Sequence, residues 1–245
     1  MILTTDLDNT LIYSYKHDIG NEKRCAEIYN GREISFITGK TFELLSAVKE
    51  RHLIVPVTTR TEEQYRRIDL GAGGFEYALV CNGGVLLKNG SEDKSWYEQS
   101  MKLTESSLPE IKKAAAILGE DENVCFEIRC IRELFVFTKS REPELTAGIL
   151  RQQLDSSLAD VFTNGVKVYA VPKMLDKGTA VERLRDYLGE KEIFAAGDSE
   201  FDIPMIKTAD HAVCPRGLVP AGENIIFCGD NELLSERMLE EALSL

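Results

Sequence analysis

Short apolar runs alternate along the chain with segments in which apolar residues recur at helical spacing. The run at residues 2–5 is brief, apolar or β-branched, and ends at a polar turn, which is typical of a buried strand. Runs at residues 53–57 and 77–81 share this character, and periodic segments at residues 41–51 and 61–68 lie between the runs. The order strand, helix, strand, helix, strand indicates a parallel, doubly wound sheet.

The pattern changes in the middle of the chain. Here the apolar positions predict the order helix, strand, strand, helix, strand, strand, with a two-residue hairpin turn at Asn164-Gly165. We therefore predict an α+β insert at residues 85–171. Its predicted segments are helices at residues 108–118 and 143–154 and strands at residues 124–131, 134–138, 161–163 and 166–171.

The α/β pattern returns after the insert. It predicts helices at residues 177–188, 201–208 and from 231, and strands at residues 193–196, 211–214 and 225–228. Residues 12–38 are mixed in character and are predicted to form a flap or hairpin, with a turn at Asn30-Gly31. The sequence as a whole predicts an α/β fold, in which a Rossmann-like core of residues 1–84 and 172–245 is interrupted by the insert.

Two aspartates, Asp6 and Asp8, directly follow the first predicted strand. Because side chains alternate along a strand, both carboxylates can point the same way at its carboxyl end, where open α/β sheets bind ligands. Two crowded carboxylates repel each other, and a hard cation such as Mg²⁺ relieves the repulsion. A polar strand-to-helix loop with capping aspartates would also explain this pattern on its own.

Polar residues at other strand ends and helix starts supply the remaining groups that phosphoryl transfer needs. Asp6 can attack phosphorus, and Asp8 can protonate the leaving oxygen and later deprotonate water. Thr58, with the backbone amides that follow it, can hydrogen-bond phosphoryl oxygens, and Lys177 can stabilise the charge that develops in the transition state.

Asp198 and Asp202 stand at a predicted helix start, where they can share in holding Mg²⁺. Each of these residues also has an ordinary interpretation. Thr58 can be a plain strand-end residue, Lys177 a solvated surface lysine, and the two aspartates helix caps near a positive dipole end. Their occurrence together, in order and in suitable contexts, favours the chemical interpretation.

In these motifs the chain resembles the haloacid dehalogenase (HAD) superfamily of phosphohydrolases over essentially its whole length. Asp6-Leu7-Asp8-Asn9-Thr10 is similar to the first motif, Thr58 to the second, Lys177 to the third, and residues 197–202 to the fourth. The insert is similar to the C2B cap of Cof-type and sucrose-phosphatase-like members.

The resemblance implies a role for each matching residue. Asp6 would be the nucleophile and a Mg²⁺ ligand, and Asp8 would be the acid/base that binds the metal through its main-chain carbonyl. Asp198 would ligate Mg²⁺, and Asp202 would act through water or by positioning Lys177. The implied phosphate-binding residues are Thr58, Thr59, Lys177 and Asn82, the last in a segment similar to the Asn-Gly turn of Cof-type members.

Three positions depart from the superfamily pattern. Asn9 replaces a glycine, and since asparagine tolerates left-handed backbone we expect the turn to persist. Thr59 replaces the glycine of the usual Thr-Gly-Arg, which changes how closely the backbone approaches phosphate. Phe201 replaces an asparagine and removes a hydrogen-bonding side chain near the metal. The reactive groups are all retained.

Composition limits the classes of partner. A net charge of −12 over 245 residues argues against nucleic acid or an anionic membrane as the partner of a broad basic surface. Apolar runs stay short of the roughly 20 residues of a membrane-spanning helix, and signal-peptide features are lacking at the amino terminus. Most of the six scattered cysteines lie in apolar, strand-like contexts, which predicts reduced, buried thiols, so we expect a cytoplasmic protein without a cysteine metal site.

We therefore expect a Mg²⁺-dependent phosphoric monoester hydrolase that acts on a small phosphorylated metabolite, a sugar phosphate, through an aspartyl-phosphate at Asp6. Two alternatives stay open: a phosphohexomutase of the phosphomannomutase type, and a non-catalytic metabolite-binding regulator on the same fold. Basic residues in or beside the insert are candidates for holding the far side of the substrate, or are solvated charges. They are Arg129, Arg132, Lys139, Lys167 and Lys173.

Overall fold

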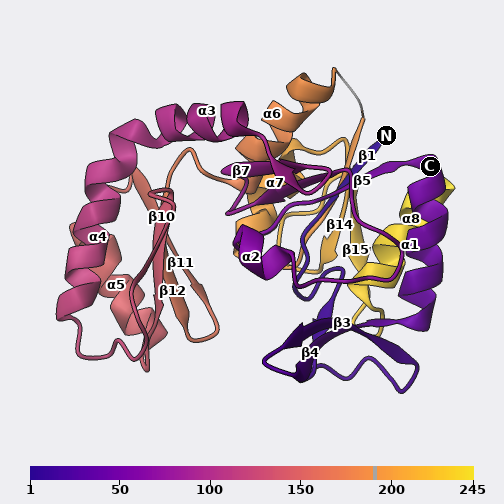
Figure 1. Cartoon of the computed structure of the whole chain (residues 1–245), viewed down its shortest axis with the longest axis horizontal. Helices are drawn as coiled ribbons and strands as arrows, with labels where there is room; N and C mark the ends of the chain where they lie inside the picture. The colour runs from indigo at the N-terminus through magenta and orange to yellow at the C-terminus, as the bar shows by residue number, and fades with distance from the viewer. Residues whose placement is uncertain (190–191) are drawn as a thin grey trace. The chain divides into compact units, whose positions relative to one another are not determined.

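The computed structural model describes residues 1–189 and 192–245 (Figure 1). The chain forms two compact units. The first comprises Met1–Asp93 and Lys177–Leu245, and the second comprises Lys94–Asp176. The assignment of residues 85–171 as an inserted domain stays a prediction.

A parallel sheet of five strands, in the order β15-β14-β13-β1-β5, forms the centre of the first unit. Every residue of β1 and β13 is buried, as is typical of a parallel sheet with helices on both faces. The predicted α/β class with a Rossmann-like parallel core is therefore confirmed. The strands are β1 (Ile2–Thr5), β5 (Leu53–Pro56), β13 (Ile193–Ala196), β14 (His211–Pro215) and β15 (Ile225–Cys228).

The strand register brings three loops to one edge of this sheet. Thr5, the last residue of β1, pairs with Ala196 at the end of β13 and with Pro56 at the end of β5. Because the three strands are parallel, their carboxyl ends meet at the same edge. The loops that begin at Asp6, at Gly197 and after β5 are therefore neighbours.

Helices cover the two faces of the sheet. Apolar residues of α1 and α8 pack with Leu3 and Phe194 in one core cluster, while α6 and α7 lie on the other side of the strands (Figure 1). The side chain of Thr38 caps the start of α1 by accepting from the N–H of Thr41. The helices are α1 (Gly39–Arg51), α6 (Lys177–Leu188), α7 (Ile203–Thr208) and α8 (Leu234–Ser244).

One predicted strand of the parallel sheet has other partners. β6 (Tyr77–Val80) pairs antiparallel with β7 (Val85–Lys88), and β7 pairs with β8 (Ser91–Glu92). On its other edge β6 meets the segment after β5 in parallel, as predicted, but only through an isolated bridge from Val57 to Leu79, so the five-stranded parallel sheet does not include it. Helix α2 (Glu62–Tyr65) ends earlier than the predicted residue 68.

The hairpin predicted within residues 12–38 is confirmed. Its strands form a three-stranded sheet in the order β2-β4-β3, with Asn30 (φ 50°) and Gly31 (φ 73°) in the turn. The pairing of β3 with β4 is irregular between Cys25 and Ile28. The strands are β2 (Tyr13–Ser14), β3 (Lys23–Tyr29) and β4 (Arg32–Thr38).

The second unit is an antiparallel sheet, in the order β11-β12-β10-β9, with one face packed against α4 and α5. A short 3-10 turn, Glu105–Ser107, precedes α4. The elements are α3 (Lys94–Thr104), α4 (Leu108–Glu120), β9 (Arg129–Ile131), β10 (Phe135–Lys139), α5 (Pro143–Gln153), β11 (Ala159–Asn164) and β12 (Lys167–Pro172).

Two features of this unit were not predicted. Helix α3 was missed because two of its three buried residues, Ser100 and Thr104, are polar and do not mark a buried face in the sequence. In the predicted strand 124–131, only residues 129–131 pair with β10 as a regular strand, because the Thr138 hydroxyl bonds the carbonyls of Phe126 and Glu127. Among the described residues, every helix is too short or too polar to traverse a lipid bilayer.

Candidate active site

Lys177, the first residue of α6, lies at the centre of the candidate active site. Its Nζ donates to Oδ1 of Asp6 and to Oδ1 of Asp202, each at 2.5 Å. The Lys177 side chain is 1% exposed and that of Asp202 is fully buried. Lys177 is therefore not the solvated surface lysine that the sequence left open.

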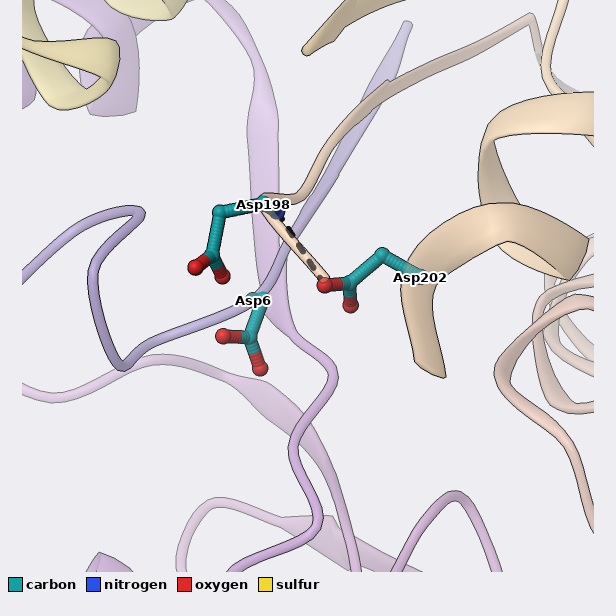
Figure 2. Close-up of side chains that lie close together, drawn as sticks. All are labelled: Asp6, Asp198 and Asp202. Atoms are coloured by element: carbon teal, nitrogen blue, oxygen red, sulfur yellow. Dashed lines mark hydrogen bonds between the residues drawn. The ribbon is translucent and has the colours of Figure 1, made fainter. Parts of the chain in front are cut away.

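Asp198 completes a cluster of three carboxylates (Figure 2). Asp6, Asp198 and Asp202 each offer an oxygen, and these oxygens lie within 4.8 Å of one another. Asp202 Oδ2 accepts from the backbone N–H of Asp198 at 3.1 Å and from the N–H and hydroxyl of Ser199 at 2.9 and 2.8 Å. Asp202 thus binds the loop of Asp198 and Ser199 through Oδ2, and it binds Lys177 through Oδ1.

Burial sets the electrostatics of this cluster. Desolvation raises the pKa of Asp6 well above its usual value, Lys177 opposes this, and the carboxylates of Asp202, Asp8 and Asp198 raise it further. Burial and then Asp202 raise the pKa of Asp198 to about 6. Burial disfavours the charged form of Lys177, but Asp202 and Asp6 outweigh it and raise the pKa of the ammonium. The single positive charge of Lys177 therefore does not balance the negative charge of the clustered carboxylates.

The donor set of this cluster fits a divalent cation. Carboxylate oxygens are the ligands that hard cations prefer, and an added positive charge would offset the repulsion that raises the pKa of Asp6 and Asp198. Both oxygens of Asp202 already accept hydrogen bonds. Direct ligation is therefore better suited to Asp6 and Asp198.

The loop after β5 is joined to the loop after β6. The N–H of Asn82 donates to the Thr58 carbonyl at 2.9 Å, and the Thr58 hydroxyl accepts from the N–H of Arg60 at 3.1 Å. Thr58 and Asn82 are both buried, whereas Thr59 is partly exposed. Cys81 (φ 53°) and Asn82 (φ 57°) adopt left-handed backbone, a conformation that asparagine tolerates better than most residues.

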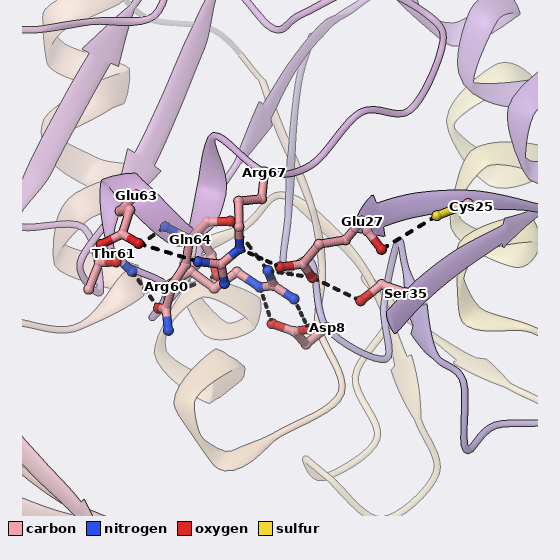
Figure 3. Close-up of polar contacts among 10 residues, drawn as sticks. Asp8, Cys25, Glu27, Ser35, Arg60, Thr61, Glu63, Gln64 and Arg67 are labelled. Atoms are coloured by element: carbon pink, nitrogen blue, oxygen red, sulfur yellow. Dashed lines mark hydrogen bonds and ion pairs between the residues drawn. The ribbon is translucent and has the colours of Figure 1, made fainter. Parts of the chain in front are cut away.

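Asp8 forms a two-point ion pair with Arg60 (Figure 3). Arg60 Nε donates to Oδ2 and Nη2 to Oδ1, both at 2.7 Å. The sequence pattern predicted no role for Arg60, although the residue directly follows Thr58 and Thr59. Proximity to Asp8 depends on a contact across 52 positions, which spacing alone does not reveal.

Two of the three departures from the superfamily pattern, Asn9 and Phe201, have local structural explanations. Asn9 has φ 60°, so the expected left-handed turn after Asp8 is confirmed. Phe201 is buried, in the 3-10 turn Glu200–Asp202 that precedes α7. The aromatic ring therefore contributes packing at a position where the superfamily usually has a polar side chain.

Comparison with known families identifies the chain. A sequence model of the haloacid dehalogenase-like hydrolases matches residues 74–215, which include Asn82, Lys177, Asp198 and Asp202. The chain belongs to the haloacid dehalogenase-like hydrolase family. The predicted family is thus confirmed, and with it an enzyme of the hydrolase class. None of the curated proteins matches this hydrolase in sequence.

Several solved structures with the same fold are named as phosphatases. The sucrose-phosphatase of Synechocystis sp. PCC6803 is 17% identical with a TM-score of 0.68, over 100% of this hydrolase and 97% of that chain. The trehalose-6-phosphate phosphatase of Aspergillus fumigatus is 12% identical with a TM-score of 0.56, over 100% and 92%. BT1666 of Bacteroides thetaiotaomicron is 15% identical with a TM-score of 0.57, over 100% and 96%. At such identities the likeness shows a shared fold.

Gly197 permits the close approach of Asp202, and we expect Gly197→Ala to disrupt the site of the hydrolase. A Cβ at position 197 would overlap the Cβ and Cγ atoms of Asp202. Overpacking of this kind costs roughly 1–3 kcal/mol in the free energy of unfolding. Thermal unfolding should show the loss, together with reduced hydrolysis. Gly148→Ala in α5 is the matched control, since a Cβ there meets no atom within 4 Å and alanine favours a helix.

Proposed function

We propose that the protein is a Mg²⁺-dependent phosphatase that hydrolyses a small phosphorylated metabolite, a sugar phosphate, through an aspartyl-phosphate on Asp6. The observation that carries this proposal is the pairing of buried Asp6 with Lys177, beside Asp198, at the carboxyl edge of the parallel sheet. Ligands of open α/β sheets bind at this edge. A carboxylate beside a fixed ammonium there is suited to accept a phosphoryl group.

The reaction would proceed in two displacements. Lys177 donates to Oδ1 of Asp6, so we assign Oδ2 as the oxygen that attacks phosphorus. Asp8 would donate a proton to the leaving alkoxide as the bond between phosphorus and the leaving oxygen breaks. Asp8 would then take a proton from the water that attacks the aspartyl-phosphate, which releases phosphate and restores Asp6.

Each remaining residue would act on the phosphoryl group or its charge. Thr58, Asn82 and the backbone amide of Thr59 would hydrogen-bond phosphoryl oxygens. Lys177 would stabilise negative charge as it develops, held in place by Asp202. Asp6 and Asp198, with the carbonyl of Asp8, would hold Mg²⁺, which supplies charge neutralisation when bound.

The names of two fold relatives support the substrate class. Two of these relatives are named as a sucrose-phosphatase and a trehalose-6-phosphate phosphatase. We propose that residues 85–171 form a C2B-type cap that supplies specificity. Of the basic candidates, Lys173 forms an ion pair with Asp160 at 2.6 Å and Arg132 lies over the Tyr97 ring, which makes both less suited to substrate. The six free cysteines support a cytoplasmic location. The net charge of −12 supports a small molecule as the partner.

Phosphate release from a panel of sugar phosphates, nucleotides and an aryl phosphate tests this proposal. The panel is run with Mg²⁺ and with chelator. Release that needs Mg²⁺ and is fastest with sugar phosphates is the expected result. Substrate conversion without net phosphate release would instead indicate a phosphohexomutase. A folded, Mg²⁺-binding protein that converts no substrate would indicate a regulator.

Mg²⁺ should stabilise the protein more at neutral than at acidic pH. The pKa of Asp198 is raised to about 6 by burial and by Asp202. Without metal, the stability that a proton on Asp198 contributes is therefore present at low pH and lost as pH rises through about 6. Metal binding needs the deprotonated carboxylate. We expect a larger Mg²⁺-induced rise in melting temperature near pH 7.5 than near pH 5.

Asp198→Asn should remove the rise in melting temperature that Mg²⁺ causes. Glu200→Gln should keep this rise, because the Glu200 side chain in the same loop is exposed. An equal rise at both pH values would contradict ligation by Asp198.

A further inference from the structure

Glu27, on β3 of the hairpin, has a buried carboxylate that contacts two arginines (Figure 3). Its side chain is 0% exposed. Oε2 accepts from Arg60 Nη1 at 2.9 Å and from the Ser35 hydroxyl at 3.0 Å, and Oε1 accepts from Arg67 Nε at 3.0 Å. The hairpin thus reaches the loop after β5 through one charged residue.

The same Arg60 guanidinium holds Asp8 by its other edge. Nη1 faces Glu27, whereas Nε and Nη2 face the two oxygens of Asp8 at 2.7 Å. The Arg60 side chain is 12% exposed and that of Asp8 is 49% exposed. Arg60 is therefore enclosed between two carboxylates, while about half of the Asp8 side chain stays exposed to solvent.

We propose that Glu27 is a positioning residue for the acid/base step: it fixes Arg60, and Arg60 fixes the carboxylate of Asp8 toward the leaving group. The inference rests on the proposed phosphatase function. An arginine side chain has several rotatable bonds, so an anchor on Nη1 restricts the orientations that Nε and Nη2 offer to Asp8. Such restraint matters because proton transfer depends on placement within a fraction of an ångström.

A purely structural role accounts less well for a charge at this position. A buried carboxylate is expensive to desolvate, and a buried ion pair stabilises a fold no better than apolar residues of similar volume. β3 is irregular at Glu27, and the N–H of Asp69 donates to the carbonyl of Ala26. The irregular pairing of β3 therefore lies at the residue whose carboxylate contacts the two arginines.

Glu27→Gln tests the proposal, since it keeps the volume and removes the charge. We compare kcat/KM for a sugar phosphate, whose alkoxide needs a proton, with that for an aryl phosphate whose leaving group needs none. We expect a loss of roughly tenfold or more for the sugar phosphate and less than about threefold for the aryl phosphate. In Arg60→Gln protein, adding Glu27→Gln should cause no further loss, because Glu27 acts through Arg60.

Arg67→Gln is the matched control. It removes the other arginine of Glu27, so we expect a lower melting temperature with kcat/KM within about twofold of the wild type. If Glu27→Gln does not fold, Glu27→Met combined with Arg67→Met removes both charges together. That double variant should show the same selective loss, while Arg67→Met alone should not.

The outcomes separate this inference from the proposed function. A wild-type protein without phosphate release would overturn both. An active wild type with an unchanged Glu27→Gln variant would overturn the positioning role alone. Equal losses on both substrates, or losses that add to those of Arg60→Gln, would show that Glu27 only stabilises the fold and would also overturn it.

Discussion

Replacing Asp6 by asparagine should abolish phosphate release and leave the fold intact. The amide is nearly isosteric with the carboxylate but is not nucleophilic, so no aspartyl-phosphate can form. Loss of a nucleophile lowers kcat by roughly 10³- to 10⁶-fold. Because the pKa of Asp6 is raised by burial and by neighbouring carboxylates, removing its charge should cost the metal-free fold little. Phosphate release and thermal unfolding, measured on the same preparation, check both parts.

Asp186→Asn provides the control for this substitution, since Asp186 is exposed on α6 and is not one of the three clustered carboxylates. We expect wild-type turnover from it. Residual release of more than about a hundredth of the wild-type rate by Asp6→Asn would argue that another group is the nucleophile.

Replacing Lys177 by methionine should remove activity and destabilise the metal-free protein. The ammonium is the buried partner of both Asp6 and Asp202, so its loss leaves two carboxylates uncompensated in a desolvated site. Breaking a buried ion pair from one side costs about 3–5 kcal/mol in the free energy of unfolding. Denaturant unfolding with chelator should show this loss, and Mg²⁺ should recover part of it by replacing the missing positive charge.

Lys207→Met, at an exposed position on α7, tests whether loss of any lysine has this effect, and we expect it to unfold like the wild type. A Lys177→Met protein as stable as the wild type in chelator would contradict the role of the ammonium as the stabilising partner of Asp6 and Asp202.

The parallel core could be predicted because its sequence pattern is local and strong. α6 and β13 have the bounds that periodicity and apolar content predicted, residues 177–188 and 193–196. α2 ends at Tyr65, before its predicted end at residue 68, and α3 was missed because two of its three buried residues are polar. The antiparallel pairing of β6 with β7 was not predicted, because an apolar strand carries no mark of parallel or antiparallel pairing.

The candidate site shows the same division. The types of residue and their order along the chain predicted a site that contains Asp6, Lys177, Asp198 and Asp202. The structure brings these four residues together. The contact of Arg60 with Asp8 and Glu27 had no counterpart in the pattern. Arginine and glutamate are common surface residues, and only burial between them distinguishes this pair.

By itself, then, the sequence determined the parallel core, the family and the residue types gathered at the edge of the sheet. These follow from short-range periodicity and from motifs that keep their spacing. The tertiary structure alone decided which carboxylates share Lys177, that Arg60 clamps Asp8, and that Glu27 of the hairpin lies behind it. Ion pairs of this kind depend on strand register and burial, which are set by packing between segments distant in the chain.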